Sequence, residues 1–288
     1  MHMNNSGKFK PGHLHLNPYW FLVLPLLLVI VALYVYPIFK LLWVSFTDPT
    51  PGLQNYQRLF TSASIHRMLW TTLKICVITT ALSLFFGYIV AYAMTHVSER
   101  HRLWMLIFVL VPFWVSVLAR AFSWLMLLHD GGLANTMFLS KGLIDEPVHL
   151  VRNQLGVVIG MVHFMIPYAV LPLFANMQGI EQRLVTAARS LGAGPFESFR
   201  YVFFPLSLPG IIGAGILVFI LTLGFFVTPA ILGGGKTVMI AEYVSVQILW
   251  AVRWGIAAML AVVLLVTIAL MLFLMTRVIN IREMFGAH

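Results

Sequence analysis

Residues 233–237 read Gly-Gly-Gly-Lys-Thr, the ending of a phosphate-binding loop. In such a loop the backbone amides cradle the phosphates of a nucleotide, and the lysine contacts their terminal oxygens. The full motif also requires a glycine five residues before its last glycine, a buried strand before it and a helix after it. Ala230 stands at that position, and a long apolar run precedes it. We therefore predict a sharp glycine turn with Lys236 solvated or near headgroups, and no nucleotide site.

Two ionisable side chains, His163 and Arg120, lie within long apolar segments. If these segments span a membrane, such residues are costly and are therefore candidates for function. His163 is either a neutral ring bonded to a neighbouring helix or a residue that lines a path through the helices. Arg120 either extends to the headgroups or makes a gating or anchoring contact. The sequence leaves both pairs of alternatives open.

Aromatic side chains are the other groups that can hold a cation, because a cation is attracted to the face of an aromatic ring. The candidates are Trp114, Tyr168, Phe225 and Phe226. The last two lie between a glycine and a proline, where we predict an irregular stretch of helix and a gate or a solute contact. Packing alone is the alternative for all four. None of the apolar segments has an acidic residue near its centre.

Composition decides what kind of chain must position these residues. Of 288 residues, 60% are hydrophobic and 9% are charged, whereas soluble domains have about 45–50% apolar and about 25% charged residues. The mean hydropathy is +0.93. Water cannot solvate so much apolar surface, so the chain must be solvated largely by lipid.

Six apolar segments are long enough to cross the hydrocarbon core, for which about 20 residues are needed. They are continuous rather than alternating, and every backbone polar group in a membrane must be satisfied internally, so helices are expected rather than a barrel. The sequence predicts an all-α polytopic membrane protein with six transmembrane helices. The predicted spans are residues 19–45, 68–95, 103–128, 155–177, 206–232 and 254–276.

Lysine and arginine accumulate in cytoplasmic segments, and an even number of spans places both termini on one side. With the N-terminus inside, nine of the 18 basic residues lie in cytoplasmic segments, six in outer segments and three within spans. This distribution favours cytoplasmic termini. The predicted organisation is a cytoplasmic tail of residues 1–18, a transmembrane domain of residues 19–277 and a cytoplasmic tail of residues 278–288.

The net charge of +9 does not indicate a nucleic-acid partner. The basic residues are scattered between apolar segments, as expected for contacts with the anionic headgroups of a lipid bilayer. The first apolar run is too long for the core of a cleavable signal peptide. Cys76, the single cysteine, falls within a predicted span, which excludes disulfides and thiolate metal sites within the chain. No metal site is predicted.

The segment at residues 179–204, between the fourth and fifth predicted spans, has a clear helical pattern. Leu184, Ala188 and Leu191 recur at i, i+4 and i+7 and share one face of a short helix. Gly192 then begins a Gly-Ala-Gly break. The proline that follows is well placed to start a second helix, in which phenylalanines recur at helical spacing. We predict two short amphipathic helices beneath the membrane, which either contact a partner protein or lie among headgroups.

This segment resembles the cytoplasmic signature of permease subunits of binding-protein-dependent ABC importers. That signature reads Glu-Ala-Ala, three residues, Gly, nine residues, then Ile-x-Leu-Pro. Here Thr186-Ala187-Ala188 match its opening, Gly192 its glycine, and residues 202–205 its close, with the spacing matched throughout. The departures are Thr186 for Glu, Val202 for Ile and Phe204 for Leu.

In that family the segment is a coupling helix that sits in a groove of the ATPase subunit. Threonine in place of glutamate removes one charged contact, so docking here is expected to depend more on shape and glycine geometry. The resemblance implies that the coupling residues are Leu184, Thr186, Ala187, Ala188, Arg189, Leu191, Gly192 and Phe196.

The resemblance extends from about residue 19 to residue 276 and is similar in detail to the polyamine-type (spermidine/putrescine) permease branch. The matching segments include VPFWVSVLAR at 111–120, IPYAVLPLF at 166–174 and LGFFVTPAILGGGKTVMI at 223–240. Such a subunit resides in the bacterial inner membrane and hydrolyses no ATP. The resemblance implies two ATPase subunits that bind ATP and Mg²⁺, a second homologous permease and a periplasmic binding protein. A polyamine is the expected cargo; an opine, γ-aminobutyrate or another small amino compound is the alternative.

An ion-coupled secondary carrier or a channel is the competing class of function. Such carriers usually place ionisable or discontinuous-helix sites at the midplane of repeated halves. We find neither an acid near the middle of a span nor an obvious repeat. A membrane enzyme is not supported, because the sequence offers no metal-ligand pair at helical spacing and no nucleophile–base constellation.

Overall fold

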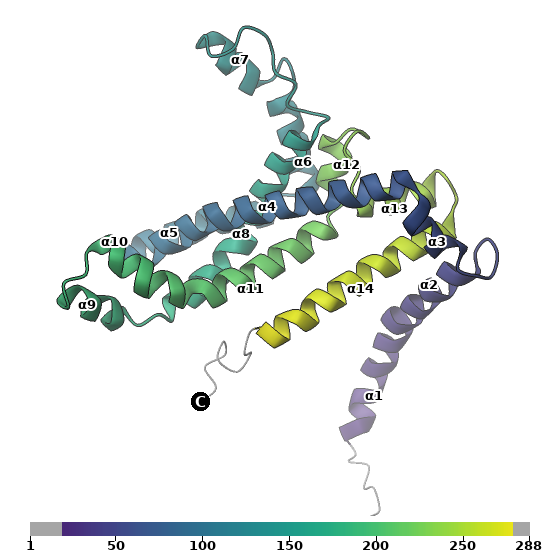
Figure 1. Ribbon diagram of the computed structural model, residues 1–288, viewed down its shortest axis with the longest axis horizontal. Helices are drawn as coiled ribbons and strands as arrows, with labels where there is room; N and C mark the ends of the chain where they lie inside the picture. The colour runs from purple at the N-terminus through teal and green to yellow at the C-terminus, as the bar shows by residue number, and fades with distance from the viewer. Residues whose placement is uncertain (1–18, 279–288) are drawn as a thin grey trace, which may run out of the picture.

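The computed structural model describes residues 19–278, which form helices joined by turns and loops and contain no strand. Figure 1 shows the long helices side by side, with short helices at both ends of the bundle and an arm that leaves its side. The predicted N-terminal tail lies outside the described residues. So does the predicted C-terminal tail, apart from Val278, which ends the last helix.

The chain begins with three consecutive segments that form one helix, of which the middle segment is a short π-helical stretch. A second π-helical stretch joins α10 to α11. The elements are α1 Tyr19–Ile30, η1 Val31–Val35, α2 Tyr36–Thr47, α3 Gln54–Thr61, α4 Ala63–His96, α5 Glu99–Trp114, α6 Val117–Leu128, α7 Leu133–Ser140, α8 Gln154–Gln178, α9 Gln182–Ser190, α10 Pro195–Ser198, η2 Phe199–Phe203, α11 Phe204–Leu223, α12 Val227–Leu232, α13 Ile240–Leu249 and α14 Trp254–Val278.

The core lies where α4, α8 and α11 pack against one another (Figure 1). Small residues permit this close approach, as is usual between membrane helices. A β-carbon on Gly87 of α4 would lie 2.8 Å from Cβ of Ala169 on α8. One on Gly210 of α11 would lie 2.6 Å from Oδ1 of Asn176, also on α8. The three helices therefore form a tight unit around α8.

Four of the predicted spans are confirmed as single helices that are long and apolar enough to cross a membrane. They correspond to Val23–Thr47, Ala63–His96, Gln154–Gln178 and Trp254–Leu274. A fifth such helix, Pro195–Leu223, and a bent helix pair account for the remaining two predicted spans. The all-α polytopic membrane fold is thus confirmed, with corrections to the third and fifth spans.

The third predicted span, residues 103–128, is wrong as one straight helix. α5 ends at Trp114, α6 begins after Ser116, and the chain changes direction by 97° between α5 and the segment Val117–Ser140. Val115 and Ser116 have ψ angles of 131° and 138°, which belong to extended backbone. Pro112 lies just before the break and offers no N–H to the last turn of α5. Apolar residues continue across the break, so hydropathy alone does not reveal it.

The fifth predicted span, residues 206–232, is displaced along the chain. The corresponding helix, Pro195–Leu223, begins in the predicted coupling loop and spans 29 residues. Gly224 ends it, and α12 is a separate short helix. The irregular stretch predicted around Phe225 is confirmed. The second amphipathic helix predicted beneath the membrane is not a separate element, because it continues into α11.

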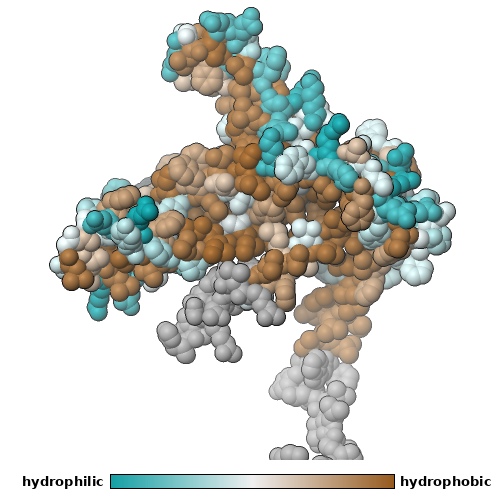
Figure 2. Space-filling model, viewed as in Figure 1, coloured by the Kyte–Doolittle hydropathy of each residue, from teal (hydrophilic) through white to brown (hydrophobic). Residues whose placement is uncertain are grey.

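Hydrophobic residues cover the middle of the bundle in the face that Figure 2 shows. Hydrophilic residues gather at the end formed by α9, at the opposite end, and at the tip and along one edge of the arm, whose stem is mostly hydrophobic. An apolar belt between two polar ends is the distribution that a bilayer requires. The bundle axis in Figure 1 therefore corresponds to the membrane normal, with α9 at one surface and α3 and α13 at the other.

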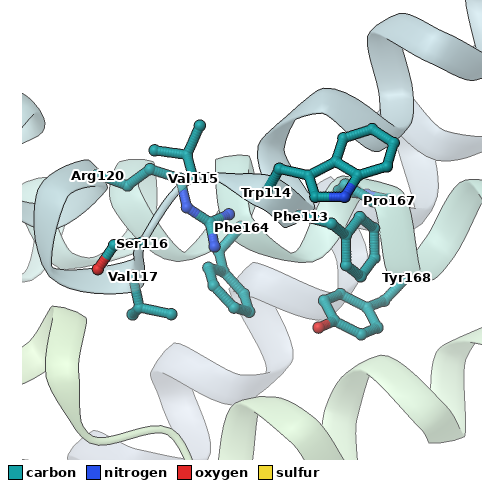
Figure 3. Close-up of a pocket in the computed structure, with 9 residues that line it drawn as sticks. All are labelled: Phe113, Trp114, Val115, Ser116, Val117, Arg120, Phe164, Pro167 and Tyr168. Atoms are coloured by element: carbon teal, nitrogen blue, oxygen red, sulfur yellow. The ribbon is translucent and has the colours of Figure 1, made fainter.

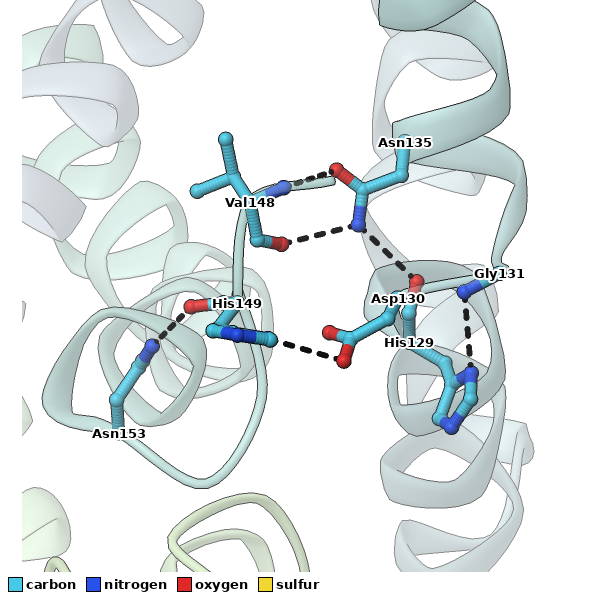
Figure 4. A network of polar contacts seen from close by, with 7 residues as sticks. All are labelled: His129, Asp130, Gly131, Asn135, Val148, His149 and Asn153. Carbon is cyan, nitrogen blue, oxygen red and sulfur yellow. Dashed lines mark hydrogen bonds and ion pairs between the residues drawn. The ribbon is translucent and has the colours of Figure 1, made fainter. Parts of the chain in front are cut away.

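The loop that returns from the arm is fixed by one buried amide (Figure 4). Nδ2 of Asn135 donates to the carbonyls of His129 and Val148, at 3.2 and 3.0 Å, and Oδ1 accepts from the Val148 amide at 2.9 Å. Nδ1 of His149 lies 2.9 Å from Oδ2 of Asp130. These contacts join both ends of the arm and fix the point from which α8 starts.

Candidate functional site

The breaks in the third and fifth spans meet at the ring of Phe164, in the middle of α8. The ring of Phe225, from the break before α12, lies 4.5 Å from that of Phe164, centroid to centroid. The guanidinium carbon of Arg120, which follows the break before α6, lies 4.3 Å from the Phe164 centroid. One turn along α8, Tyr168 stacks on Phe164 with the centroids 5.8 Å apart. Irregular backbone at membrane depth is tolerated only inside protein or along a cavity, so this meeting point is the candidate site.

Arg120 contacts a ring on a neighbouring helix, and its gating or anchoring role stays a prediction. Its guanidinium lies within the range of a cation–π interaction with Phe164. Nε of Arg120 is buried and has no hydrogen-bond partner among the described residues. The aromatic ring is therefore the main partner of this cation in the described part of the chain.

A cavity of about 270 Å³ opens beside this contact (Figure 3). In Figure 3 the guanidinium of Arg120 points toward the ring of Phe164, while Phe113, Trp114 and Tyr168 stand together on the other side. Phe113 and Tyr168 have their ring centroids 5.0 Å apart. Val115, Ser116 and Val117 of the backbone break also line the cavity, and in Figure 3 Ser116 and Val117 lie on the side of Phe164 away from the three other rings. The cavity thus combines several aromatic faces with one positively charged side chain.

His163 is hydrogen-bonded to a neighbouring helix, as one of its two predicted roles required. Nε1 of Trp124, on α6, donates to Nδ1 of His163 at 3.2 Å. Nδ1 is the acceptor, so a neutral ring carries its proton on Nε2. His163 also lines a second cavity of about 320 Å³ between α5 and α8, whose other walls are apolar. His163 is therefore both hydrogen-bonded to α6 and part of a cavity wall.

The predicted path residues do not all converge. Arg120, Trp114 and Tyr168 line the first cavity, and Phe225 reaches it through Phe164. Phe226 is partly exposed and takes no part in the ring contacts at this site. Sequence reasoning missed Phe164 and Phe113. The spacing of Phe164 and Tyr168 at i and i+4 on one helix face was the available signal for the first.

The first short amphipathic helix predicted in residues 179–204 is present as α9, which ends in a glycine-dependent cap; its coupling role stays a prediction. The amide of Ala193 donates to the carbonyl of Ala188 at 3.1 Å, and that of Gly192 donates to Arg189 at 3.0 Å. These two bonds form a Schellman motif. It requires a left-handed residue after the helix, and Gly192 has φ of +95°. The glycine of the signature is therefore explained by backbone conformation.

The surface of α9 and of the turn after it is exposed in the described part of the chain. No residue of α9 is buried, and Leu191 is 89% exposed. Leu184 and Phe196 are also exposed apolar side chains. Oγ1 of Thr186 donates to the carbonyl of Gln182 at 3.0 Å, so the hydroxyl that replaces the signature carboxylate is bonded within its own helix. The predicted coupling residues lie together at one end of the bundle; Ala187, Arg189 and Gly192 are exposed, and Ala188 is half-buried.

Aromatic contacts fasten this loop to α4. The ring of Tyr92 meets those of Phe199 and Phe203 edge-on, with centroid distances of 5.4 and 5.1 Å. The hydroxyl groups of Tyr88 and Ser207 are hydrogen-bonded at 3.0 Å. Phe203 is buried and Tyr92 and Phe199 are half-buried, and close-packed side chains transmit strain. A displacement of the loop must therefore move α4 and α11 together.

The glycine-rich segment at residues 233–237 forms the predicted turn. Gly234 and Gly235 have φ of +54° and +75°, and the amide of Lys236 donates to the carbonyl of Gly233 at 3.1 Å. A helix, α12, precedes the turn instead of a strand. The arrangement lacks the strand, the first glycine and the following helix start that would cradle phosphates.

The profile of a protein family, described as the inner membrane component of binding-protein-dependent transport systems, matches residues 83–280. The chain is 31% identical over 225 residues to the spermidine/putrescine transport system permease protein PotB of Haemophilus influenzae, covering 78% of each chain. It is 30% identical over 233 residues to the protein of that name in Escherichia coli, covering 81% of this chain and 84% of that one.

Solved structures show the same fold. A bacterial ABC transporter involved in the import of the acidic polysaccharide alginate contains a chain that matches with a TM-score of 0.69 and 19% identity. The match covers 90% of this chain and 96% of that one. The alginate transporter in complex with its pentasaccharide-bound periplasmic protein gives a TM-score of 0.72 and 17% identity, covering 90% and 93%. The chain belongs to the family of inner membrane components of binding-protein-dependent transport systems, the permease subunits of ABC importers.

Proposed function

We propose that the chain pairs with a second, homologous permease and forms with it the path for a small amine-type solute. A periplasmic binding protein delivers the solute, and a polyamine is the favoured cargo. Two observations support this choice of cargo. The relatives with about 30% identity carry spermidine/putrescine names, and the candidate site is rich in the aromatic faces that attract ammonium groups.

The observation that carries the proposal is the continuous packing between α9 and the two helix breaks. Tyr92 and Phe203 join the loop to α4 and α11, both of which pack on α8. α8 carries Phe164, where Arg120 and Phe225 meet. A force applied at α9 therefore has a contiguous route to the candidate site.

Two ATPase subunits supply that force in this proposal, and they hold the ATP and Mg²⁺. The exposed surface of α9 and of the turn after it docks in a groove of one ATPase subunit, with Ala187 and Ala188 allowing close approach. ATP binding moves the two coupling loops of the permease pair and favours one of two conformations. Such a shift requires contacts that differ in free energy between the two conformations.

The proposed orientation places α9 in the cytoplasm of a bacterium and α3 and α13 at the periplasmic face of its inner membrane. In this orientation four spans lie between the N-terminus and α9, and two lie between α9 and the C-terminus. Both termini are therefore on the cytoplasmic side with α9. The turn at Lys236 is then periplasmic, on the side of the membrane where ATP is not supplied.

ATP hydrolysis and uptake by the reconstituted complex test the proposal. The tagged chain is purified with the subunits that accompany it, placed in vesicles with its binding protein and given putrescine, spermidine, γ-aminobutyrate or an opine. We expect co-purified ATPase activity that one amine stimulates, together with ATP-dependent uptake of that amine. An intact chain that brings no ATPase with it, or uptake driven by an ion gradient without ATP, contradicts the proposal.

A further inference from the structure

A cation of the protein itself already stands on the central ring of the cavity. Cζ of Arg120 lies 4.3 Å from the centroid of Phe164, well inside the range of about 6 Å for a cation–π contact. Among residues 19–278, Nε of Arg120 is buried and has no hydrogen-bond partner. The ion pair in this part of the chain joins His149 to Asp130 and does not include Arg120. The guanidinium lies over an aromatic face, and it forms no ion pair with a carboxylate of residues 19–278.

The rings that meet at Phe164 are the groups that a substrate ammonium needs. Tyr168 stacks on Phe164, and Phe113 packs on Tyr168, so the three rings adjoin one another in the lining of the cavity (Figure 3). Trp114 is 80% exposed and also lines the cavity. The volume of about 270 Å³ is close to the lower end of the range of about 300–1,000 Å³ for small-molecule pockets. The size and the lining fit one end of a slender amine.

We propose that this cavity is a subsite for a primary ammonium group and that Arg120 is a built-in competitor for it. The inference rests on the proposed function, because it takes the solute to be an amine. The Arg120 guanidinium and a substrate ammonium need the same face of Phe164. Two like charges at contact distance repel strongly where water is scarce. The solute can therefore occupy the face only when the arginine side chain swings away.

The competition has a use in transport. Conduction through a membrane path requires binding that is strong enough for the solute to enter and weak enough for it to leave. An aromatic cage without the arginine would hold a cation more tightly and release it more slowly. Arg120 lowers the affinity of the cage and returns to the ring when the solute leaves. Phe225 contacts the same ring from the other helix break.

Direct binding of a defined amine tests the inference. The probe is radiolabelled putrescine, and the protein is the complete complex of permeases and ATPase subunits in nanodiscs, without the binding protein. Arg120→Met and Arg120→Gln remove the charge, Arg120→Lys keeps it, and Phe164→Leu removes the ring. Lys74→Met is the matched control, because Lys74 is an exposed cation on α4 that does not line the cavity.

We expect both neutral variants at Arg120 to bind putrescine about 3- to 10-fold more tightly than the wild type, which is the scale of a lost cation–π competitor. Arg120→Lys and Lys74→Met should stay within about twofold of the wild type, and Phe164→Leu should bind more weakly. Unchanged or weaker binding in the neutral variants overturns the inference and makes Arg120 a receptor for an anionic group or a structural anchor. Absence of putrescine binding in every variant overturns the subsite.

A separate measurement distinguishes failure of the inference from failure of the proposed function. ATP-dependent putrescine uptake by the wild-type complex, with its binding protein, depends only on the proposed function. A complex that transports putrescine but shows no gain of affinity in Arg120→Met and Arg120→Gln refutes the competition alone. A complex that does not transport putrescine refutes the polyamine assignment, whatever the variants bind.

Discussion

The ring of Tyr92 on α4 meets the ring of Phe203 edge-on, with the centroids 5.1 Å apart. Phe203 is buried, and it belongs to the helical segment that begins in the coupling loop. The contact therefore joins the surface proposed to meet the ATPase to the helix that packs along α8. Tyr92 also meets Phe199 edge-on, so its ring is a sensitive place to test transmission between these parts.

Tyr92→Leu should reduce ATP-dependent uptake several-fold and leave most of the basal ATP hydrolysis of the complex. Removal of the ring loses an aromatic pair worth about 0.5–1.5 kcal/mol beyond its buried area, and this loosens the loop from α4. Uptake and hydrolysis are measured on the same vesicles. Tyr201→Leu is the control, because Tyr201 lies on the π-helical stretch that contains Phe203 but its side chain is 72% exposed. Equal losses in both variants would argue against transmission through Tyr92.

Gly192→Ala should cut coupled uptake by about tenfold while the protein still inserts into the membrane. An alanine at φ of +95° is strained by about 1–2 kcal/mol, and a difference of about 1.4 kcal/mol is a factor of ten. No atom outside the loop would clash with the new methyl group, so the effect comes from the backbone. Gly194→Ala is the control, since Gly194 has φ of −66°. Uptake is compared at equal amounts of membrane-inserted protein.

Phe225→Ala should change the concentration dependence of uptake more than the basal rate of ATP hydrolysis. Phe225 contacts Phe164 at the candidate site and is far along the chain from the coupling loop. Phe226→Ala, at the next position and without a ring contact at this site, should have the smaller effect. Identical uptake kinetics in wild type and Phe225→Ala would remove Phe225 from the solute path.

Lys236→Ala should leave ATP binding and hydrolysis by the complex within about twofold of the wild type. The residue lies in a glycine turn after a helix and has no strand behind it, so it lacks the geometry that brings a lysine to phosphate oxygens. Nucleotide binding is measured by fluorescence titration of the purified complex. Loss of binding in this variant would restore the nucleotide-site interpretation of residues 233–237.

Glu242→Gln should raise the apparent melting temperature at pH 8 and have little effect at pH 5. Burial raises the pKa of the Glu242 carboxyl, which is 8% exposed on α13 between the fifth and sixth spans; a hydrogen bond from the Met239 backbone opposes the shift without cancelling it. The folded state therefore binds the proton more tightly than the unfolded state. The stability that this bound proton contributes is fully present below the pKa of the carboxyl in the unfolded state. It is lost as the pH rises through the pKa of the carboxyl in the folded state.

The pH test for Glu242 needs an exposed carboxylate for comparison. Glu146 lies in the loop after α7 and is exposed, so Glu146→Gln controls for the change in net charge. Melting curves of both variants and the wild type are recorded between pH 5 and pH 8. If the difference in melting temperature between Glu242→Gln and the wild type does not grow with pH, protonation of Glu242 is not linked to folding.

Long apolar runs predicted the class of the protein and four of its spans, because the length of a hydrophobic run is set by the bilayer. They failed where the chain bends inside the apolar region. Val115 and Ser116 adopt extended conformations, yet their neighbours are as apolar as those in the middle of a helix. The start of the fifth span was also misplaced, since Pro195 marks a helix start whose continuation into α11 is decided by packing against α4.

The coupling loop was predicted in more detail than the candidate site. Its pattern is local: the stripe of α9 and the left-handed Gly192 are properties of consecutive residues. The site depends on contacts between distant segments, such as Arg120 with Phe164 across 44 positions. The sequence placed both residues in apolar segments and drew attention to the arginine, but no rule of spacing could bring the two together.

The segment Pro195–Leu223 is one continuous helix, so a movement of the proposed coupling loop is carried to the far end of that helix. Its 29 residues make a rod of about 43 Å at a rise of about 1.5 Å per residue. A tilt of about 10° about the middle of such a rod carries its two ends roughly 4 Å in opposite directions. Phe225 follows the far end of the rod, 4.5 Å from Phe164. A small rocking motion at the α9 end therefore moves the other end by about the spacing between the two rings.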